Sequence, residues 1–66
     1  MSKKEHAEEA MRQYEAMEYY RKVYNNLSAE EREQMGTGQK TRGQYTREAY
    51  ELAKARFTYH TNMAHV

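Results

Sequence analysis

The sequence predicts an all-α fold, a helical hairpin with a short middle helix that dimerisation completes into a helical bundle. Three features indicate this class: proline is absent, all three glycines lie within eight residues, and two Ser-x-x-Glu capping boxes precede helix-forming stretches. The length suits a single helical domain, residues 1–66. A domain of this size buries only about 60% of its unfolded surface, so its stability is expected to be marginal.

The first helix is predicted at residues 3–25. Ser2 and Glu5 have the spacing of a capping box, in which each side chain bonds the backbone N–H of the other residue. Asn25 and Asn26 are expected to end the helix, because asparagine tolerates the left-handed conformation of a helix C-cap.

A short second helix is predicted at residues 29–35. Ser28 and Glu31 form the second capping box, and acidic side chains in the first turn suit the positive end of the helix dipole. Gly36 is expected to supply the C-cap of this helix.

A glycine-rich basic loop is expected at residues 36–45, followed by a third helix at about 47–62. Thr46 is a suitable N-cap for that helix, and Glu48 falls in its first turn. This order of elements predicts that the third helix folds back on the first.

The hydrophobic residues are few and of an unusual kind. The chain has two leucines, two valines, no isoleucine and one phenylalanine, against seven tyrosines, five methionines and eight alanines. Low aliphatic content indicates disorder only together with a high net charge, and the net charge here is +1. We therefore expect a chain that folds but needs a second copy or another partner to bury enough surface, a role that tyrosine suits.

Projection at 100° per residue gives the first helix two apolar faces, rotated by about a quarter turn from each other. The first face contains Ala7, Ala10, Met11, Tyr14 and Met17. The second face contains Ala16, Tyr20, Val23, Tyr24 and Leu27. A single flat partner is not expected to cover both faces.

The third helix shows the same surplus of apolar surface. One set contains Tyr50, Ala53, Phe57 and Ala64, and its neighbour contains Ala49, Leu52, Tyr59 and Met63. One set is expected to close the hairpin and the other to meet a second chain in a twofold dimer. The residues predicted for this dimer or partner interface are Tyr14, Met17, Tyr20, Tyr24, Tyr50, Arg56, Phe57 and Tyr59. The alternative is one loose core with partly exposed tyrosines.

Arg56 interrupts the apolar surface of the third helix near its middle, with His60 one turn further on. One interpretation is a side chain that packs its stem and keeps its charged head in water. The other is an interface anchor that pairs with Glu18 or another carboxylate, because arginine and tyrosine are enriched among binding hot spots.

The sequence contains no recognisable catalytic or cofactor motif. In Gly36–Thr41 the glycine and lysine of a phosphate-binding loop are separated by Gln39, so we expect a connector. Cysteine is absent, and His60 and His65 are five residues apart, so surface histidines and no metal site are expected. We expect no cofactor and no enzymatic activity.

The basic residues Lys40, Arg42 and Arg47 support an alternative function in nucleic-acid regulation, because the segment from Gln34 to Arg47 contains no acidic residue. Three cations on a nearly neutral chain make few phosphate contacts, however. A third hypothesis is a structural or assembly subunit, which would form oligomers larger than a dimer.

The first hypothesis for function is therefore a small helical protein that binds and modulates a partner protein. No apolar segment resembles a signal or a membrane span, so a cytoplasmic location and no membrane contact are expected. Such cysteine-free chains are common among bacteriophage accessory proteins, which is a similarity of general type without a shared motif.

Overall fold

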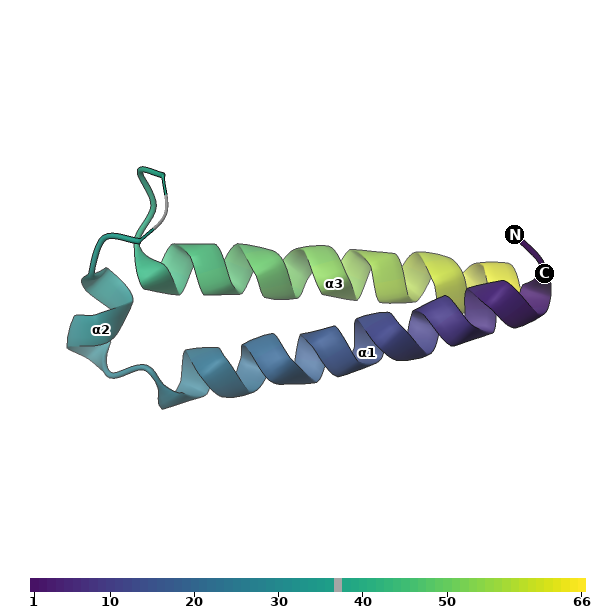
Figure 1. The fold of residues 1–66 in the computed structure, drawn as a ribbon, viewed down its shortest axis with the longest axis horizontal. Helices are drawn as coiled ribbons and strands as arrows, with labels where there is room; N and C mark the ends of the chain where they lie inside the picture. Colours follow the sequence, from purple (N-terminus) through teal and green to yellow (C-terminus); the bar gives the residue numbers. More distant parts are fainter. Residues whose placement is uncertain (37) are drawn as a thin grey trace.

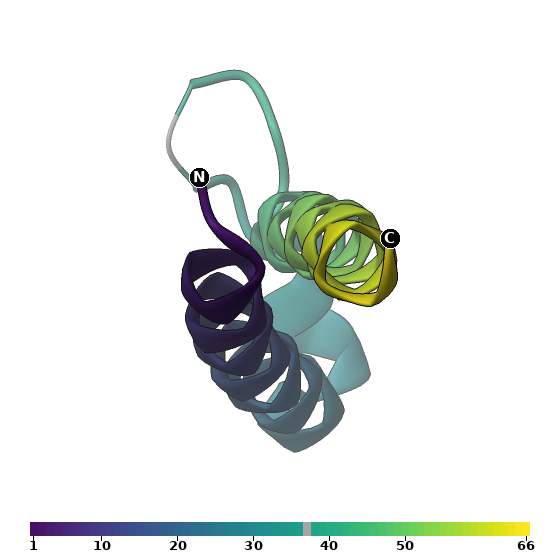
Figure 2. The same ribbon diagram turned by 90° about the vertical axis from the view of Figure 1, so that its right-hand side faces the viewer.

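The computed structural model describes residues 1–36 and 38–66 and confirms the all-α prediction. Its helices are α1 (Lys3–Asn26), α2 (Ala29–Glu33) and α3 (Arg42–His65), which make the described chain 82% helical, without a strand. Figures 1 and 2 show α1 and α3 side by side and antiparallel, with α2 closing one end and both termini at the other.

Both predicted capping boxes are present, each with its two hydrogen bonds. The N–H of Glu5 donates to the Ser2 hydroxyl (3.1 Å), and the N–H of Ser2 donates to the Glu5 carboxylate (3.0 Å). Ser28 and Glu31 make the same exchange at 3.1 and 2.9 Å. These local contacts fix where α1 and α2 begin.

The prediction that the third helix starts near residue 47 behind Thr46 is wrong, because α3 begins at Arg42. Thr41 is the N-cap, and it forms a third capping box with Gln44. Thr46 instead lies buried inside α3, where its hydroxyl donates to the backbone carbonyl of Arg42 (2.8 Å). The Thr-x-x-Gln pattern thus overrides the helix-breaking tendency of a glycine in the first turn.

That glycine, Gly43, is explained by close packing between α2 and α3. A β-carbon at this position would lie 3.0 Å from both the backbone oxygen and the Cβ of Arg32. Arg32 in turn spreads over the ring of Tyr24, with its guanidinium carbon 4.2 Å from the ring centroid, and donates to the Tyr24 carbonyl. Gly43 therefore lets α2 seal the end of the hairpin.

The predicted loop at 36–45 is shorter than expected, because α3 begins at Arg42. The N–H of Gly36 donates to the Lys40 carbonyl (2.8 Å) and that of Arg42 donates to the Gln34 carbonyl (2.7 Å). Gly38 supplies the positive φ of the turn, 73°, and Thr37 lies outside the described residues.

Both predicted helix C-caps are also corrected. α2 ends at Glu33 and is capped by extended Gln34, not by Gly36. α1 runs through Asn26 and is capped by extended Leu27, so neither asparagine takes a left-handed conformation. Leu27 is buried, and its burial fixes the direction in which the chain leaves α1.

α1 and α3 meet along one line of residues that recur at alternating intervals of three and four, which we call the seam. Every member is buried or half-buried, and the average spacing of 3.5 residues is that of coiled-coil helices. On the α1 side the seam contains His6, Ala10, Gln13, Met17, Tyr20, Tyr24 and Leu27. On the α3 side it contains Gly43, Thr46, Tyr50, Ala53, Phe57, His60 and Ala64.

The seam shows that the two faces predicted for the first helix are only partly separate. A wheel drawn at 100° per residue drifts by about 20° per heptad relative to a 3.5-residue repeat, so a single seam appears split. Ala10 and Met17 from the first predicted face join Tyr20, Tyr24 and Leu27 from the second. α3 therefore covers these five residues, whereas Met11 and Tyr14 of the first predicted face stay 59% and 46% exposed.

The hydrophobic core along this seam is thin. Ala10, Leu27 and Ala53 are the buried apolar side chains of the described residues, and no large side chain there is fully buried. The accessible surface is 5079 Å², whereas a compact monomer of 7.9 kDa exposes about 4,400 Å². The Cα radius of gyration is 14.2 Å, against about 11 Å for a compact chain of this length.

The capping boxes predict an acid-sensitive stability. The pKa values of Glu5 and Glu31 lie below their ordinary value of 4.5, mainly because the backbone N–H of the capping serine donates to each carboxylate and secondarily because the serine hydroxyl does. Because the folded-state pKa is lowered, this stabilisation is present above the unfolded pKa and disappears as pH falls through the folded pKa.

We therefore expect the melting temperature to fall between neutral pH and about pH 3, and to fall less in the double variant Glu5→Gln/Glu31→Gln. Glutamine keeps an acceptor oxygen at both caps but does not titrate. Circular dichroism melts at the two pH values measure the difference. An equal fall in both proteins would show that the capping carboxylates do not cause the acid sensitivity.

Candidate protein-contact surface

The two flanks of the seam on α3 differ in chemistry. From Thr46 to Ala64, each residue that directly follows a seam residue is polar, and each that directly precedes one is apolar except at Arg56. The polar flank contains Arg47, Glu51, Lys54, Thr58, Thr61 and His65. The apolar flank, which we call the outer stripe, contains Tyr45, Ala49, Leu52, Arg56, Tyr59 and Met63. α3 therefore carries a second apolar line with heptad spacing, next to the one that closes the hairpin.

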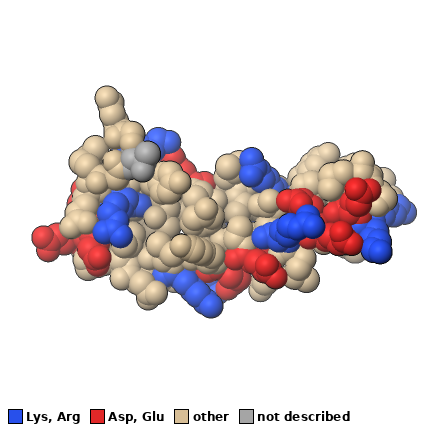
Figure 3. All heavy atoms as spheres, viewed as in Figure 1, with Lys and Arg blue, Asp and Glu red and all other residues tan. Residues whose placement is uncertain are grey.

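Much of the outer stripe is exposed to solvent. Tyr45 and Leu52 each expose 52% of their surface, and Tyr59 exposes 55%. A shallow groove continues the stripe toward α1, where Ala16 and Tyr20 form its other wall. In Figure 3, uncharged side chains cover the middle of one face of the hairpin, and charged ones gather along its edges and over the N-terminal part of α1.

Arg56 lies near the middle of the outer stripe and lines the same groove. Its side chain is exposed and takes part in no ion pair or hydrogen bond with the described residues. The carboxylate of Glu18, considered as its partner, instead binds Arg21 of the same helix. A free guanidinium in an apolar line is suited to pairing with a carboxylate or an aromatic ring on another molecule.

The eight residues predicted for the interface lie in three places. Five of them are half-buried in the seam, where they close the hairpin: Met17, Tyr20, Tyr24, Tyr50 and Phe57. Arg56 and Tyr59 belong to the outer stripe. Tyr14, 46% exposed, directly follows a seam residue and packs its ring on Phe57 with centroids 5.8 Å apart.

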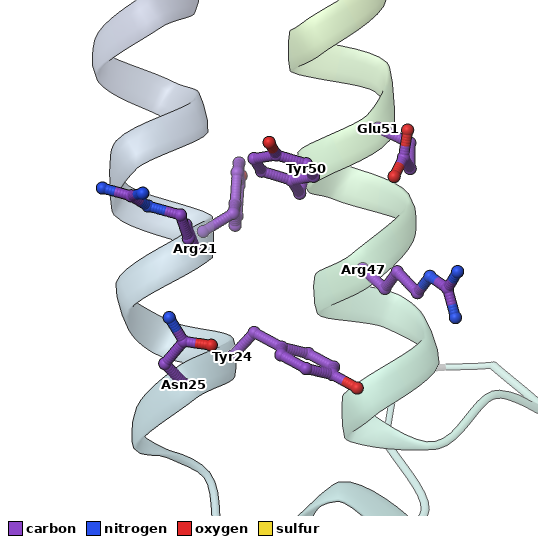
Figure 4. Close-up of a pocket in the computed structure, with 7 residues that line it drawn as sticks. Arg21, Tyr24, Asn25, Arg47, Tyr50 and Glu51 are labelled. Carbon is purple, nitrogen blue, oxygen red and sulfur yellow. The ribbon is translucent and has the colours of Figure 1, made fainter.

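A second groove runs along the side of the seam opposite the outer stripe. Its walls come from residues that directly follow seam residues, among them Arg21, Arg47 and Glu51. In Figure 4 the rings of Tyr24 and Tyr50 each reach toward the opposite helix, at different heights, whereas both arginine head groups point away. This groove has a tyrosine floor and polar edges, and its side chains form no nucleophile, base and orienting group in contact.

The predicted basic patch is partly neutralised. Lys40 forms an ion pair with Glu48, and Arg42 donates to Gln34 (3.0 Å) and lies 3.9 Å from Glu31. Phosphate groups would have to compete with these partners. Arg47 lies away from both cations, in the groove of Figure 4.

The histidines differ from the expectation of surface side chains. His6 is buried with 6% exposure and faces His60 across the seam, and their Nδ1 atoms are 2.9 Å apart. His65 is exposed. Residues 1–36 and 38–66 contain no group of three or more His, Cys, Asp or Glu side chains that could hold a metal.

Sequence reasoning missed two parts of these surfaces. The predicted interface contains neither Tyr45 nor Leu52, although both continue the heptad line from Tyr59. Tyr45 was assigned to the loop, and Leu52 was placed in the apolar set of Tyr59 but not in the interface. The contact between His6 and His60 carries no local signal, because it depends on the register of two helices far apart in sequence.

The helices were also compared with membrane spans and the chain with known proteins. None of the helices in the described part of the chain has the length and apolar character needed to cross a membrane. Comparison with protein-family models, curated proteins and solved structures found no significant match.

Proposed function

We propose that this chain is a non-catalytic interaction protein that pairs with a second copy through the outer stripe and, as that pair, binds and modulates a partner protein. The observation that carries the proposal is the division of α3 into an apolar line before the seam and a polar line after it. Random substitution on a surface without function would not keep one flank of α3 apolar and the other flank polar.

The accessible surface area and the net charge of the chain both favour a second copy of the chain as the molecule that covers the outer stripe. The accessible surface exceeds that of a compact monomer by about 700 Å², and a standard interface buries about 800 Å² per partner. The net charge of +1 gives two copies little mutual repulsion.

The pattern also suits twofold symmetry. An antiparallel pair of α3 helices centred near residue 54 would place Tyr45 of one copy near Met63 of the other, and Arg56 near Leu52. Each contact then occurs twice, as an isologous interface requires.

The exposed residues on the other flank of α1 are the proposed contact for a partner protein. Met11 exposes 59% of its surface and Tyr14 exposes 46%. Both directly follow seam residues, so they lie on the side opposite the outer stripe and stay accessible when two copies pair. Methionine and tyrosine are enriched at protein–protein contacts.

The test is to introduce a charged side chain into the outer stripe and to measure the dimer dissociation constant. We expect Leu52→Glu to raise the dimer dissociation constant at least tenfold, which corresponds to about 1.4 kcal/mol, because the carboxylate must be buried against the second copy. Thr58→Glu, which adds the same group to the polar flank of the same helix, is expected to change it less than about twofold. Sedimentation equilibrium over a range of concentrations measures both constants.

Arg56→Ala belongs in the same series. We expect it to weaken pairing by more than about 0.5 kcal/mol if the guanidinium anchors the interface, and by less if it only packs its stem. A wild-type chain that stays monomeric and fully helical at about 100 μM would refute pairing through this stripe. Oligomers larger than a dimer would favour an assembly subunit instead.

A further inference from the structure

At the open end of the hairpin, where both termini lie (Figure 1), His6 of α1 faces His60 of α3. The ring centroids are 5.1 Å apart, and the ring planes are tilted by 37°. With the Nδ1 atoms 2.9 Å apart, the Nδ1–H of one ring donates a hydrogen bond to the Nδ1 of the other, and a single proton lies between them. Both Nδ1 atoms therefore point into the same small space between the helices.

The spacing of the rings suits a metal ion in place of that proton. In tetrahedral zinc coordination, with Zn–N distances of about 2.0–2.1 Å, two imidazole nitrogens lie roughly 3.4 Å apart and their ring centres roughly 5 Å apart. The observed centroid separation already has this value. A small tilt of the two rings would open the Nδ1 atoms by roughly half an ångström without moving either helix.

The surroundings favour a cation. The carboxylate of Glu9 lies one helical turn from His6, and its pKa is lowered mainly by hydrogen bonds from Gln13 and Arg12 and to a lesser degree by His60. This carboxylate therefore stays ionised beside the histidine pair. The ring of Tyr59 packs edge-on against both imidazoles, with centroids 5.9 Å from His6 and 5.0 Å from His60, and shields one side.

We propose that His6 and His60 form a two-ligand site for a zinc-like dication, with water in the remaining coordination positions. Imidazole is the ligand type that zinc, nickel and copper prefer over magnesium and calcium. Bound there, the ion would join the first turn of α1 to the last turns of α3, the end of the hairpin that α2 does not close. The inference concerns a single chain and does not depend on pairing through the outer stripe.

The test is a titration of the full chain with ZnCl₂ by isothermal calorimetry. We expect one saturable zinc site per chain, weakened at least tenfold by His6→Ala and by His60→Gln, the latter keeping a polar side chain of similar reach. His65→Ala removes the third, exposed histidine and is expected to change the affinity less than twofold. Zinc is expected to raise the melting temperature of the wild type and of His65→Ala by several degrees, and magnesium is not.

Several outcomes would overturn this site. They are the absence of saturable zinc binding by the wild type up to about 1 mM, an equal loss in His65→Ala, or a stoichiometry of one zinc per two chains. Circular dichroism at 20 °C establishes that each variant remains helical before titration. The variant Leu52→Glu is expected to keep its zinc affinity, so failure of pairing and failure of the metal site give different results.

Discussion

Replacement of Leu27 by alanine is expected to leave a large fraction of the chain unfolded at 25 °C. Leu27 is the one large aliphatic side chain that the described residues bury, and it occupies the seam position nearest α2. Truncation of a buried leucine to alanine costs about 2–5 kcal/mol. A domain of 66 residues has a total stability of only about 3–10 kcal/mol, and the thin core places this chain at the low end.

The matched control is the same substitution at Leu52, which lies in the outer stripe and is 52% exposed. In a sample dilute enough to dissociate the proposed pair, Leu52→Ala is expected to change the free energy of unfolding by at most about 0.5 kcal/mol. Urea denaturation followed by helical circular dichroism compares the two variants. Equal losses would mean that Leu52 supports the fold and that the outer stripe is not a free surface.

The capping residues show which part of this fold could be predicted from sequence. Ser2 with Glu5 and Ser28 with Glu31 act over three residues, so their spacing alone locates two helix starts. Thr41 with Gln44 has the same spacing, but Gly43 between them belongs to the cluster of glycines that predicted a loop there. Its reason for being there, the approach of Arg32, exists only in three dimensions.

The assignment of tyrosines to inner and outer surfaces needed the structure for a different reason. Tyr50 and Tyr59 fall in different apolar sets of α3 whether the repeat is 3.5 or 3.6 residues, so periodicity alone does not tell which set faces α1. The sequence thus predicts that α3 has two apolar sets, and the structure shows that the set containing Tyr50 closes the hairpin. Only the relative register of α1 and α3 then brings His6 to His60.

The two apolar lines of α3 therefore differ in their surroundings: the seam packs against α1, and much of the outer stripe is exposed. Small seam residues such as Ala53 let α1 and α3 approach closely, whereas Tyr45 and Tyr59 lie one position away from the seam, on the outer stripe, and are about half exposed. Because so little apolar surface is buried, the free energy of unfolding is expected to be small. A substitution in the seam is therefore expected to unfold the chain, whereas the same substitution at a neighbouring exposed position is not.

Ala53→Asp is the most direct test of this difference between the seam and the exposed positions of α3. Ala53 is 4% exposed in the seam, so a carboxylate there must be buried against α1 or force the helices apart. An uncompensated buried charge costs about 3–5 kcal/mol. Arg56 lies three residues further on in the adjacent groove, but a helical pair of that spacing returns only about 0.2–0.5 kcal/mol. We therefore expect Ala53→Asp to lose most of its helical circular dichroism at 25 °C.

Ala55→Asp introduces the same side chain two residues away, on the exposed face of α3. It carries the same loss of helix propensity, about 0.5 kcal/mol, without burial, and is expected to keep its helical signal. The comparison separates burial in the seam from any general intolerance of α3 to aspartate. If both variants stay folded, α1 and α3 are not held together along this seam, and the distinction between the seam and the outer stripe fails with it.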